Sequence, residues 1–203
     1  RYNVIQWAHR STRGWSYGSS VVDPRTGEII KGHVSLGSLR IRQDFMIAIG
    51  LLEAPYKSTG NKEKIALDMA LSRIKQLSAH EIGHTLGFSH NFLASSNKNS
   101  SVMDYPHPII NIKNNKIDIK NAYSSGIGEW DKVSVAYSYS EFDESEDENI
   151  ELNKILENAY KNNLRFISDK DSRPKGSSHP LAHLWDNGED AIIELKKIMK
   201  VRD

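Results

Sequence analysis

The chain has 203 residues, and its 27 lysines and arginines are balanced by 26 aspartates and glutamates, for a formal net charge of +1. This balance provides no electrostatic field for nucleic acid or an anionic membrane, so we expect neither as a partner. The absence of cysteine excludes disulfides and thiolate metal sites. No stretch reaches the roughly 18 apolar residues of a membrane span, and the length fits one domain with a buried core.

The first third of the chain has the pattern of a small sheet. Residues 2–7 and 15–22 are rich in β-formers and predict two strands. In the turn at residues 23–27, proline sets one φ angle and glycine adopts a positive one, so the chain reverses into a third strand at residues 28–36. Because the chain opens directly into a strand-like run without a signal peptide, we expect it to be a piece of a longer precursor.

Two helices are expected after the sheet. Ser38 is a candidate N-cap for a helix at residues 39–52, whose apolar residues share one face. A break containing proline and glycine at residues 54–60 separates it from a long helix that starts near Asn61. The helical period of the second helix continues as far as His80. We therefore expect the residues around His80 to be held rigidly at the C-terminal end of a buried helix.

That helix end carries the run His-Glu-Ile-Gly-His-Thr-Leu-Gly-Phe-Ser-His. His80 and His84 are four residues apart, about 6 Å along a helix axis, and so lie on one face where two imidazoles can bind one metal ion. Glu81 lies beside that face, where it can reach a water molecule on the metal and act as a general base. Gly87 allows the helix to end in a left-handed turn. The turn brings His90 back as a third ligand.

Three imidazole ligands leave the fourth position of a tetrahedral zinc ion available to water, as in catalytic sites. Hard cations prefer oxygen ligands, so we expect one catalytic Zn²⁺ at this motif. The motif has five fixed positions, at His80, Glu81, His84, Gly87 and His90. Given how often His, Glu and Gly occur in this chain, all five would fall in register by chance on the order of once in twenty thousand such chains. The alternative is an amphipathic helix that carries solvated histidines.

Downstream of the motif the sequence predicts loops, one hairpin and further helices. Asn114 and Asn115 tolerate positive φ angles, which favours a two-residue turn between strands at residues 110–112 and 117–119. Helices are expected at residues 130–139, at residues 150–164 and after the capping residues 186–188.

Two other segments contain residues that could bind a metal ion. The acidic run at residues 141–151 lacks the ligand spacing of a calcium loop, so we expect a solvated loop that leads into a helix, with calcium as an unsupported alternative. His179 and His183 are again four residues apart, but no glutamate follows the first and Pro180 lies between them. We expect surface or packing histidines there, with a second metal site as the alternative.

The motif and the residues after it resemble the metzincin clan of zinc metallopeptidases, whose extended pattern is followed by a methionine turn. The run Ser-Val-Met-Asp-Tyr looks like that turn. Met103 matches the methionine that lies beneath the three histidines in the clan. Tyr105 matches the tyrosine that helps to stabilise the reaction intermediate in the astacin and serralysin branches. Ordinary loop packing is the alternative for both residues.

The branch of the clan is less well defined by the residues. Asn91, directly after the third histidine, matches neither the acidic nor the proline variants of the clan. The wider pattern, including Gly-Glu-Trp-Asp with Asp131 at the start of a helix, is most similar to large, poorly characterised bacterial zinc metallopeptidases. The resemblance implies secretion or a cell-envelope or periplasmic location.

The resemblance also implies a fold. We expect an α+β, zincin-like catalytic domain over residues 1–203. Residues 1–90 would form an N-terminal part, with a small mixed sheet over a long active-site helix. Residues 91–203 would form a mostly helical C-terminal part that contains the methionine turn.

In the resembled clan the strand before the active-site helix is the sheet edge that pairs with an extended substrate, which adds a strand to the sheet. An interior strand is the alternative. The candidate substrate-lining residues are His33, Val34, Ser35 and Leu36. His107 is a further candidate substrate contact because it follows Tyr105 by two residues.

The function predicted from these residues is that of a zinc endopeptidase acting on a protein or peptide substrate. One alternative is a catalytically inactive zinc-containing module that binds peptide or glycan; the intact Glu81 argues against it. The other is a structural domain in which the metal only stabilises the fold, and chelation would unfold such a domain.

Overall fold

The computed structural model describes residues 2–12, 14–52 and 61–202. Its elements are β1 (Val4–Ala8), β2 (Tyr17–Val22), β3 (Ile29–Gly37), α1 (Leu39–Leu51), α2 (Asn61–Thr85), the 3-10 helix η1 (Ala94–Ser96), β4 (Asn111–Lys113), β5 (Lys116–Asp118), α3 (Glu129–Tyr139), α4 (Glu148–Lys161), α5 (Asp169–Ser172) and α6 (Ala191–Arg202). The predicted strands and helices match these bounds to within a few residues, and α5 and η1 were not predicted. The predicted break at residues 54–60 lies outside the described residues.

The chain groups into two compact units, which we describe separately. The first unit comprises Arg1–Gly87, His107–Gly126 and Ala191–Asp203, and the second comprises Phe88–Pro106 and Ile127–Asp190. The predicted α+β fold with a small mixed sheet and a largely helical remainder is confirmed. The predicted division of one domain after residue 90 stays a prediction.

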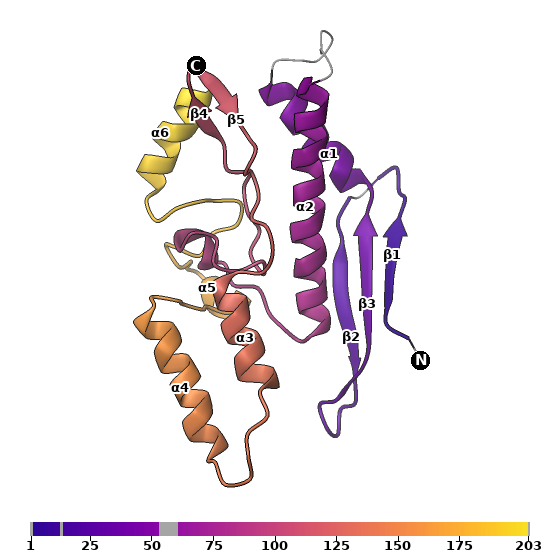
Figure 1. Cartoon of the computed structure of the whole chain (residues 1–203), viewed down its shortest axis with the longest axis vertical. Coiled ribbons are helices and arrows are strands. Elements are labelled where there is room, and N and C mark those ends of the chain that lie inside the picture. Colours follow the sequence, from indigo (N-terminus) through magenta and orange to yellow (C-terminus); the bar gives the residue numbers. More distant parts are fainter. Residues whose placement is uncertain (1, 13, 53–60, 203) are drawn as a thin grey trace. The chain divides into compact units, whose positions relative to one another are not determined.

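The first unit is built on a three-stranded sheet in the order β1-β3-β2, with β1 parallel and β2 antiparallel to β3. The long helix α2 lies along this sheet, and α1 packs beside α2 (Figure 1). A glycine makes the close approach of β2 to α2 possible. A Cβ atom added at Gly18 would lie 1.9 Å from the carbonyl oxygen of Glu81, so any larger residue would force the strand and the helix apart.

The position of β3 in the sheet corrects one prediction. Residues 33–36 belong to the central strand, with β1 on one side and β2 on the other, so the prediction that they form the sheet edge was wrong. Order along the chain does not determine order in a sheet, and here the first strand pairs in parallel with the third. The edge strands of this sheet are β1 and β2.

The apolar core of the first unit lies between α1, α2 and the segment around β5. Its buried residues are Ala48, Ile49, Ala66, Met69, Ile119, Ala122 and Tyr123. A polar pair is built into this core, since the Tyr123 hydroxyl donates a 2.8 Å hydrogen bond to the fully buried Asp44 carboxylate. Asp44 also pairs with Arg40 at 3.1 Å, which offsets the cost of burying its charge. The position of α1 is thus determined by both apolar and polar contacts.

Two turn predictions for the first unit can be compared with the structure. Asn114 and Asn115 have φ angles of 52° and 55° and join β4 to β5, as predicted. Ser38 occupies the N-cap position of α1, as predicted, but it has helical backbone angles and its side chain makes no capping hydrogen bond. β3 runs directly into α1 at this point, and the backbone is already helical at the residue expected to cap it.

The second unit consists of η1, α3, α4 and α5 with the irregular segments around them. The predicted solvated acidic loop leads into α4, where Asp147 accepts hydrogen bonds from the backbone N–H groups of Asn149 and Ile150 and caps the helix. Trp130 of α3 stacks on Phe166 with 5.6 Å between the ring centroids. None of the described helices in either unit is long and apolar enough to cross a membrane.

Candidate metal centre

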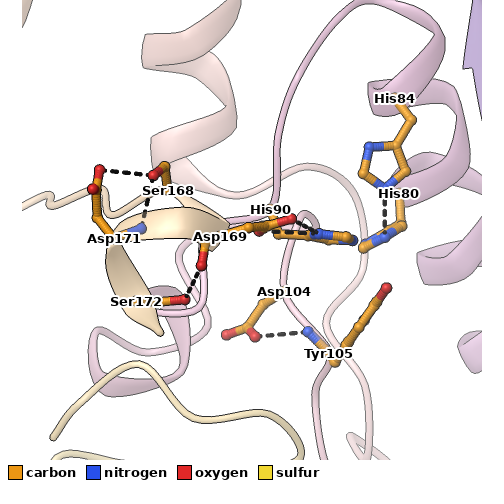
Figure 2. Close-up of polar contacts among 9 residues, drawn as sticks. All are labelled: His80, His84, His90, Asp104, Tyr105, Ser168, Asp169, Asp171 and Ser172. Carbon is orange, nitrogen blue, oxygen red and sulfur yellow. Dashed lines mark hydrogen bonds and ion pairs between the residues drawn. The ribbon is translucent and has the colours of Figure 1, made fainter. Parts of the chain in front are cut away.

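Helix α2 presents two histidines of the motif on one face. The Nε2 atoms of His80 and His84 lie 3.1 Å apart, and the two rings meet edge to face with 4.7 Å between their centroids (Figure 2). His80 is buried and His84 is partly exposed. As predicted from their spacing of four residues, His80 and His84 lie on one face of the helix and direct their Nε2 atoms to one point.

A third histidine completes the cluster. His80, His84 and His90 each offer one ring nitrogen, and these three atoms lie within 4.8 Å of one another. Zinc–nitrogen bonds of about 2.0–2.1 Å place the nitrogens of a tetrahedral site roughly 3.3 Å apart, so the donor set and its spacing fit a zinc ion. Within residues 2–12, 14–52 and 61–202, no other group of three His, Asp or Glu side chains has this property.

Glu81 is almost completely buried next to the first ligand. Burial raises the pKa of its carboxyl group to about 7, and two weaker influences oppose the rise. The backbone N–H of Gly18 donates a hydrogen bond to the carboxylate, and the positive charge of Arg73 favours its ionised form. A carboxyl group with this pKa can both accept and release a proton near neutral pH, which is the requirement for a general acid and base.

Gly87 ends the motif helix in the predicted way. α2 extends to Thr85, the N–H of Gly87 donates to the carbonyl of His84 at 3.1 Å, and Gly87 has a φ angle of +87°. A residue with a side chain would be strained in this conformation. The chain leaves the helix here and reaches His90 three residues later.

His90 lies in a segment without regular secondary structure, where neighbours from the second unit hold its ring. Its Nδ1 lies 2.9 Å and 3.2 Å from the two carboxylate oxygens of Asp169 (Figure 2). Its ring stacks on Phe92 with 5.1 Å between centroids and 16° between planes. The ring of Tyr105 meets His90 edge to face, at a centroid distance of 4.7 Å. The ring orientation of His90 is therefore determined by several neighbours at once.

The turn that contains Met103 lies against the backbone after His90. The carbonyl of Met103 accepts a 2.9 Å hydrogen bond from the N–H of Asn91, and the Met103 side chain is buried. Tyr105 stacks on Trp185 with 5.3 Å between centroids, and the Trp185 N–H donates to the Tyr105 carbonyl at 3.0 Å. Whether these two residues take the roles of the clan's methionine and tyrosine stays a prediction.

Asp131 connects the same turn to the first turn of α3. Its buried carboxylate accepts hydrogen bonds from the Ser101 hydroxyl at 2.5 Å, the Val102 N–H at 2.8 Å and the Gly128 N–H at 2.6 Å. A Cβ atom at Gly128 would lie 2.0 Å from the carbonyl oxygen of Ser100, so a glycine is required at this crossing. The resemblance placed Asp131 at a helix start, and the structure shows how it holds the turn.

The predicted substrate residues lie in the sheet and beside the hairpin. His33 stacks on Tyr17 of β2, with ring centroids 6.2 Å apart. Val34, Ser35 and Leu36 are buried. The Nδ1 of His107 lies 3.0 Å from the carbonyl oxygen of Pro108. A role of these residues in substrate binding stays a prediction. The expectation that His179 is a surface or packing histidine also stays a prediction; its Nδ1 accepts a hydrogen bond from the N–H of Leu181.

Two residues that contact the motif, Gly18 and Asp169, were not identified from the sequence, and neither was Trp185, which contacts Tyr105. Gly18 and Asp169 lie far from the motif along the chain, Trp185 lies far from Tyr105, and no spacing rule links them. Asp169 is 79 residues from His90 and stands in a short run of charged residues that has no distinctive pattern. A local signal for these contacts does not exist, because they are made by the tertiary fold.

Comparison with known proteins gives one match. A family model described as Met-zincin matches residues 62–203, which is well over half of the chain and includes the whole histidine motif. No curated protein and no solved structure matches the chain. The family match and the cluster of three histidines support the metzincin-type resemblance and zinc as the metal, without identifying a branch of the clan. The chain belongs to the Met-zincin family.

Proposed function

We propose that this protein is a zinc-dependent endopeptidase. The observation that carries the proposal is the cluster of three ring nitrogens within 4.8 Å with the buried carboxyl group of Glu81 directly beside the first of them. A structural zinc site would have four protein ligands, whereas three imidazoles leave a position for water. Membership of the Met-zincin family supports the same assignment.

His80, His84 and His90 would hold the metal through their ring nitrogens. A bound zinc ion supplies a Lewis acid that lowers the pKa of water to about 7 and polarises a carbonyl group. Glu81 would accept a proton from the attacking water and pass it to the nitrogen of the leaving amine. Its pKa of about 7, which results from burial, suits both transfers at neutral pH.

Two further parts of the site belong to the proposal. Tyr105, whose ring contacts that of His90, would donate a hydrogen bond from its hydroxyl to the developing oxyanion. An extended peptide that adds a strand to the sheet would have to do so at β1 or β2. Of these, β2 is the strand that contacts Glu81, through the N–H of Gly18. A secreted or envelope location rests on the resemblance alone.

The test is cleavage of an unfolded protein such as casein by the zinc-loaded chain and by its Glu81→Gln variant. We expect the variant to retain one zinc ion per chain and to lose about 10²- to 10⁴-fold in rate, because the proton acceptor is gone while the ligands remain. Glu63→Gln, in the first turn of the same helix, is the matched control and should cut at the wild-type rate.

Two results would contradict the proposal. A Glu81→Gln variant that cuts as fast as the wild type would remove Glu81 from the mechanism. A wild-type chain that binds one zinc ion but cuts neither casein nor a mixture of unfolded proteins would favour the zinc-containing binding module.

A further inference from the structure

Asp169 contacts the third histidine of the cluster from a distant part of the sequence. The Nδ1 of His90 lies 2.9 Å and 3.2 Å from its carboxylate oxygens, and Asp169 is the first residue of the short helix α5 (Figure 2). A carboxylate only accepts hydrogen bonds, so the contact requires that the proton of the imidazole be on Nδ1. The lone pair of Nε2 then remains available for a metal ion.

We propose that Asp169 is the positioning residue of His90, and that it holds this histidine in the tautomer and ring orientation that bind zinc. The inference rests on the zinc-binding part of the proposed function. Histidine ligands generally donate their second ring N–H to a carboxylate or carbonyl group, which raises the basicity of the ligand and determines its orientation. Loss of such a partner typically costs 10- to 100-fold in metal affinity.

The segment around Asp169 contacts three consecutive residues of the histidine segment. The carbonyl of Arg165 accepts a 2.9 Å hydrogen bond from the side-chain amide of Asn91. The guanidinium of Arg173 lies 5.5 Å from the ring centroid of Phe92, within the range of a cation–π contact. Residues 165, 169 and 173 thus contact residues 91, 90 and 92. This pattern aligns the two segments and makes the pairing of Asp169 with His90 more than a chance surface contact.

The backbone that carries Asp169 is itself held in place. The Ser172 hydroxyl donates to the carbonyl of Asp169 at 2.8 Å, and Ser172 is fully buried. The Ser172 carbonyl accepts a 2.8 Å hydrogen bond from the N–H of His179, and the Ser168 hydroxyl caps the helix at the N–H of Asp171. The Asp169 side chain is 55 % exposed, so an ion pair alone would contribute little to stability. Positioning of His90 accounts better for the hydrogen bonds that fix the backbone around Asp169.

The experiment measures zinc affinity by competition with a chelator for the full chain and for Asp169→Ala and Asp169→Asn. We expect a 10- to 100-fold loss for Asp169→Ala and a smaller loss for Asp169→Asn, whose amide oxygen still accepts a hydrogen bond from Nδ1. Asp171→Asn is the matched control. Its carboxylate lies on the same helix and accepts from the Ser168 hydroxyl at 2.8 Å, so the variant should bind zinc within twofold of the wild type.

A second readout separates positioning from a merely structural role. The ¹⁵N chemical shifts of His90 in the metal-free chain should report a proton on Nδ1 in the wild type and a mixture of tautomers in Asp169→Ala, with the folded spectrum otherwise retained. Wild-type affinity and an unchanged tautomer in Asp169→Ala would overturn the proposal.

Casein cleavage measured in parallel distinguishes the two proposals. A wild type that binds zinc without cutting, together with a loss of affinity in Asp169→Ala, would overturn the peptidase and keep the positioning role. A wild type that cuts, together with unchanged affinity in Asp169→Ala, would do the reverse. A wild type that binds no zinc would overturn both.

Discussion

The candidate ligands of this protein are held in two different ways. His80 and His84 stand on a regular helix, where a spacing of four residues is sufficient to bring their Nε2 atoms to 3.1 Å. His90 stands in an irregular segment, and its ring is held by Asp169, Phe92 and Tyr105. A helix positions its side chains by its own backbone hydrogen bonds, whereas a side chain in a loop is held in place by contacts with neighbouring residues.

This difference has a consequence for substitutions. The helix ligands should tolerate changes at distant positions as long as α2 remains packed on its sheet. The loop ligand should be sensitive to buried hydrogen bonds that order the turn next to it.

The largest effect is expected at Asp131. Asp131→Ala would leave the Ser101 hydroxyl and the N–H groups of Val102 and Gly128 without their acceptor. These groups lie in or beside the turn in which the Met103 carbonyl accepts a hydrogen bond from the N–H of Asn91. Because unsatisfied buried groups cost about 1–3 kcal/mol each, we expect the free energy of unfolding to fall by about 3–5 kcal/mol. Urea unfolding of the metal-free protein measures this.

The control for Asp131 is the exposed N-cap of α4 in the same unit. Asp147→Ala removes two capping hydrogen bonds at the surface and should cost about 1 kcal/mol. If Asp131→Ala were no more destabilising than Asp147→Ala, the carboxylate would not be what orders the turn.

A smaller effect is expected at Gly18, where β2 touches α2. Gly18→Ala would place a Cβ atom 1.9 Å from the carbonyl oxygen of Glu81, so the strand and the helix would have to separate. We expect a loss of about 2–3 kcal/mol in the free energy of unfolding. Gly50→Ala in α1 is the opposite control, because nothing lies within 4 Å of its added Cβ and alanine favours a helix, with a gain of up to about 1 kcal/mol. Two variants of equal stability would show that the contact at Gly18 is not tight.

The smallest effect is a change of stability with pH at Asp104 in the second unit. Its buried carboxylate accepts hydrogen bonds from the N–H groups of Ser95 and Tyr105, but burial dominates and raises its pKa to about 7, with a further contribution from the negative charge of Asp186. Since the folded pKa lies above the ordinary value of 3.8, the stabilising contribution is complete below about pH 4 and is lost as the pH rises through 7.

Unfolding free energies at a series of pH values check this prediction. Asp104→Asn carries no charge at any pH, so its curve should lack the fall between about pH 4 and pH 7 that the wild type shows. Asp118→Asn is a control of opposite sign, because hydrogen bonding to Lys113 lowers the pKa of Asp118 and its contribution is lost only as the pH falls. A wild-type curve parallel to that of Asp104→Asn would place the pKa of Asp104 near its ordinary value.

Much of the fold was predictable where the signal is local. The periodicity of apolar residues identified α1 and α2, and two asparagines identified the hairpin turn between β4 and β5. The order of strands was not predictable, because the parallel pairing of β1 with β3 depends on how the chain crosses the sheet. The sequence placed the N-cap of α1 correctly at Ser38 but not the missing side-chain hydrogen bond, since the backbone is already helical where the chain passes from β3 into α1.

The sequence by itself determined the chemistry of the site: two histidines four residues apart on a helix, the glutamate beside them, the glycine that ends the helix and the third histidine beyond it. Each of these follows from short-range geometry. Only the tertiary structure decided what holds those groups in place. Gly18 beside Glu81, Asp169 beside His90 and Asp131 beside the Met103 turn are contacts between residues far apart in the chain. Such contacts depend on the packing of whole elements, which no local spacing records.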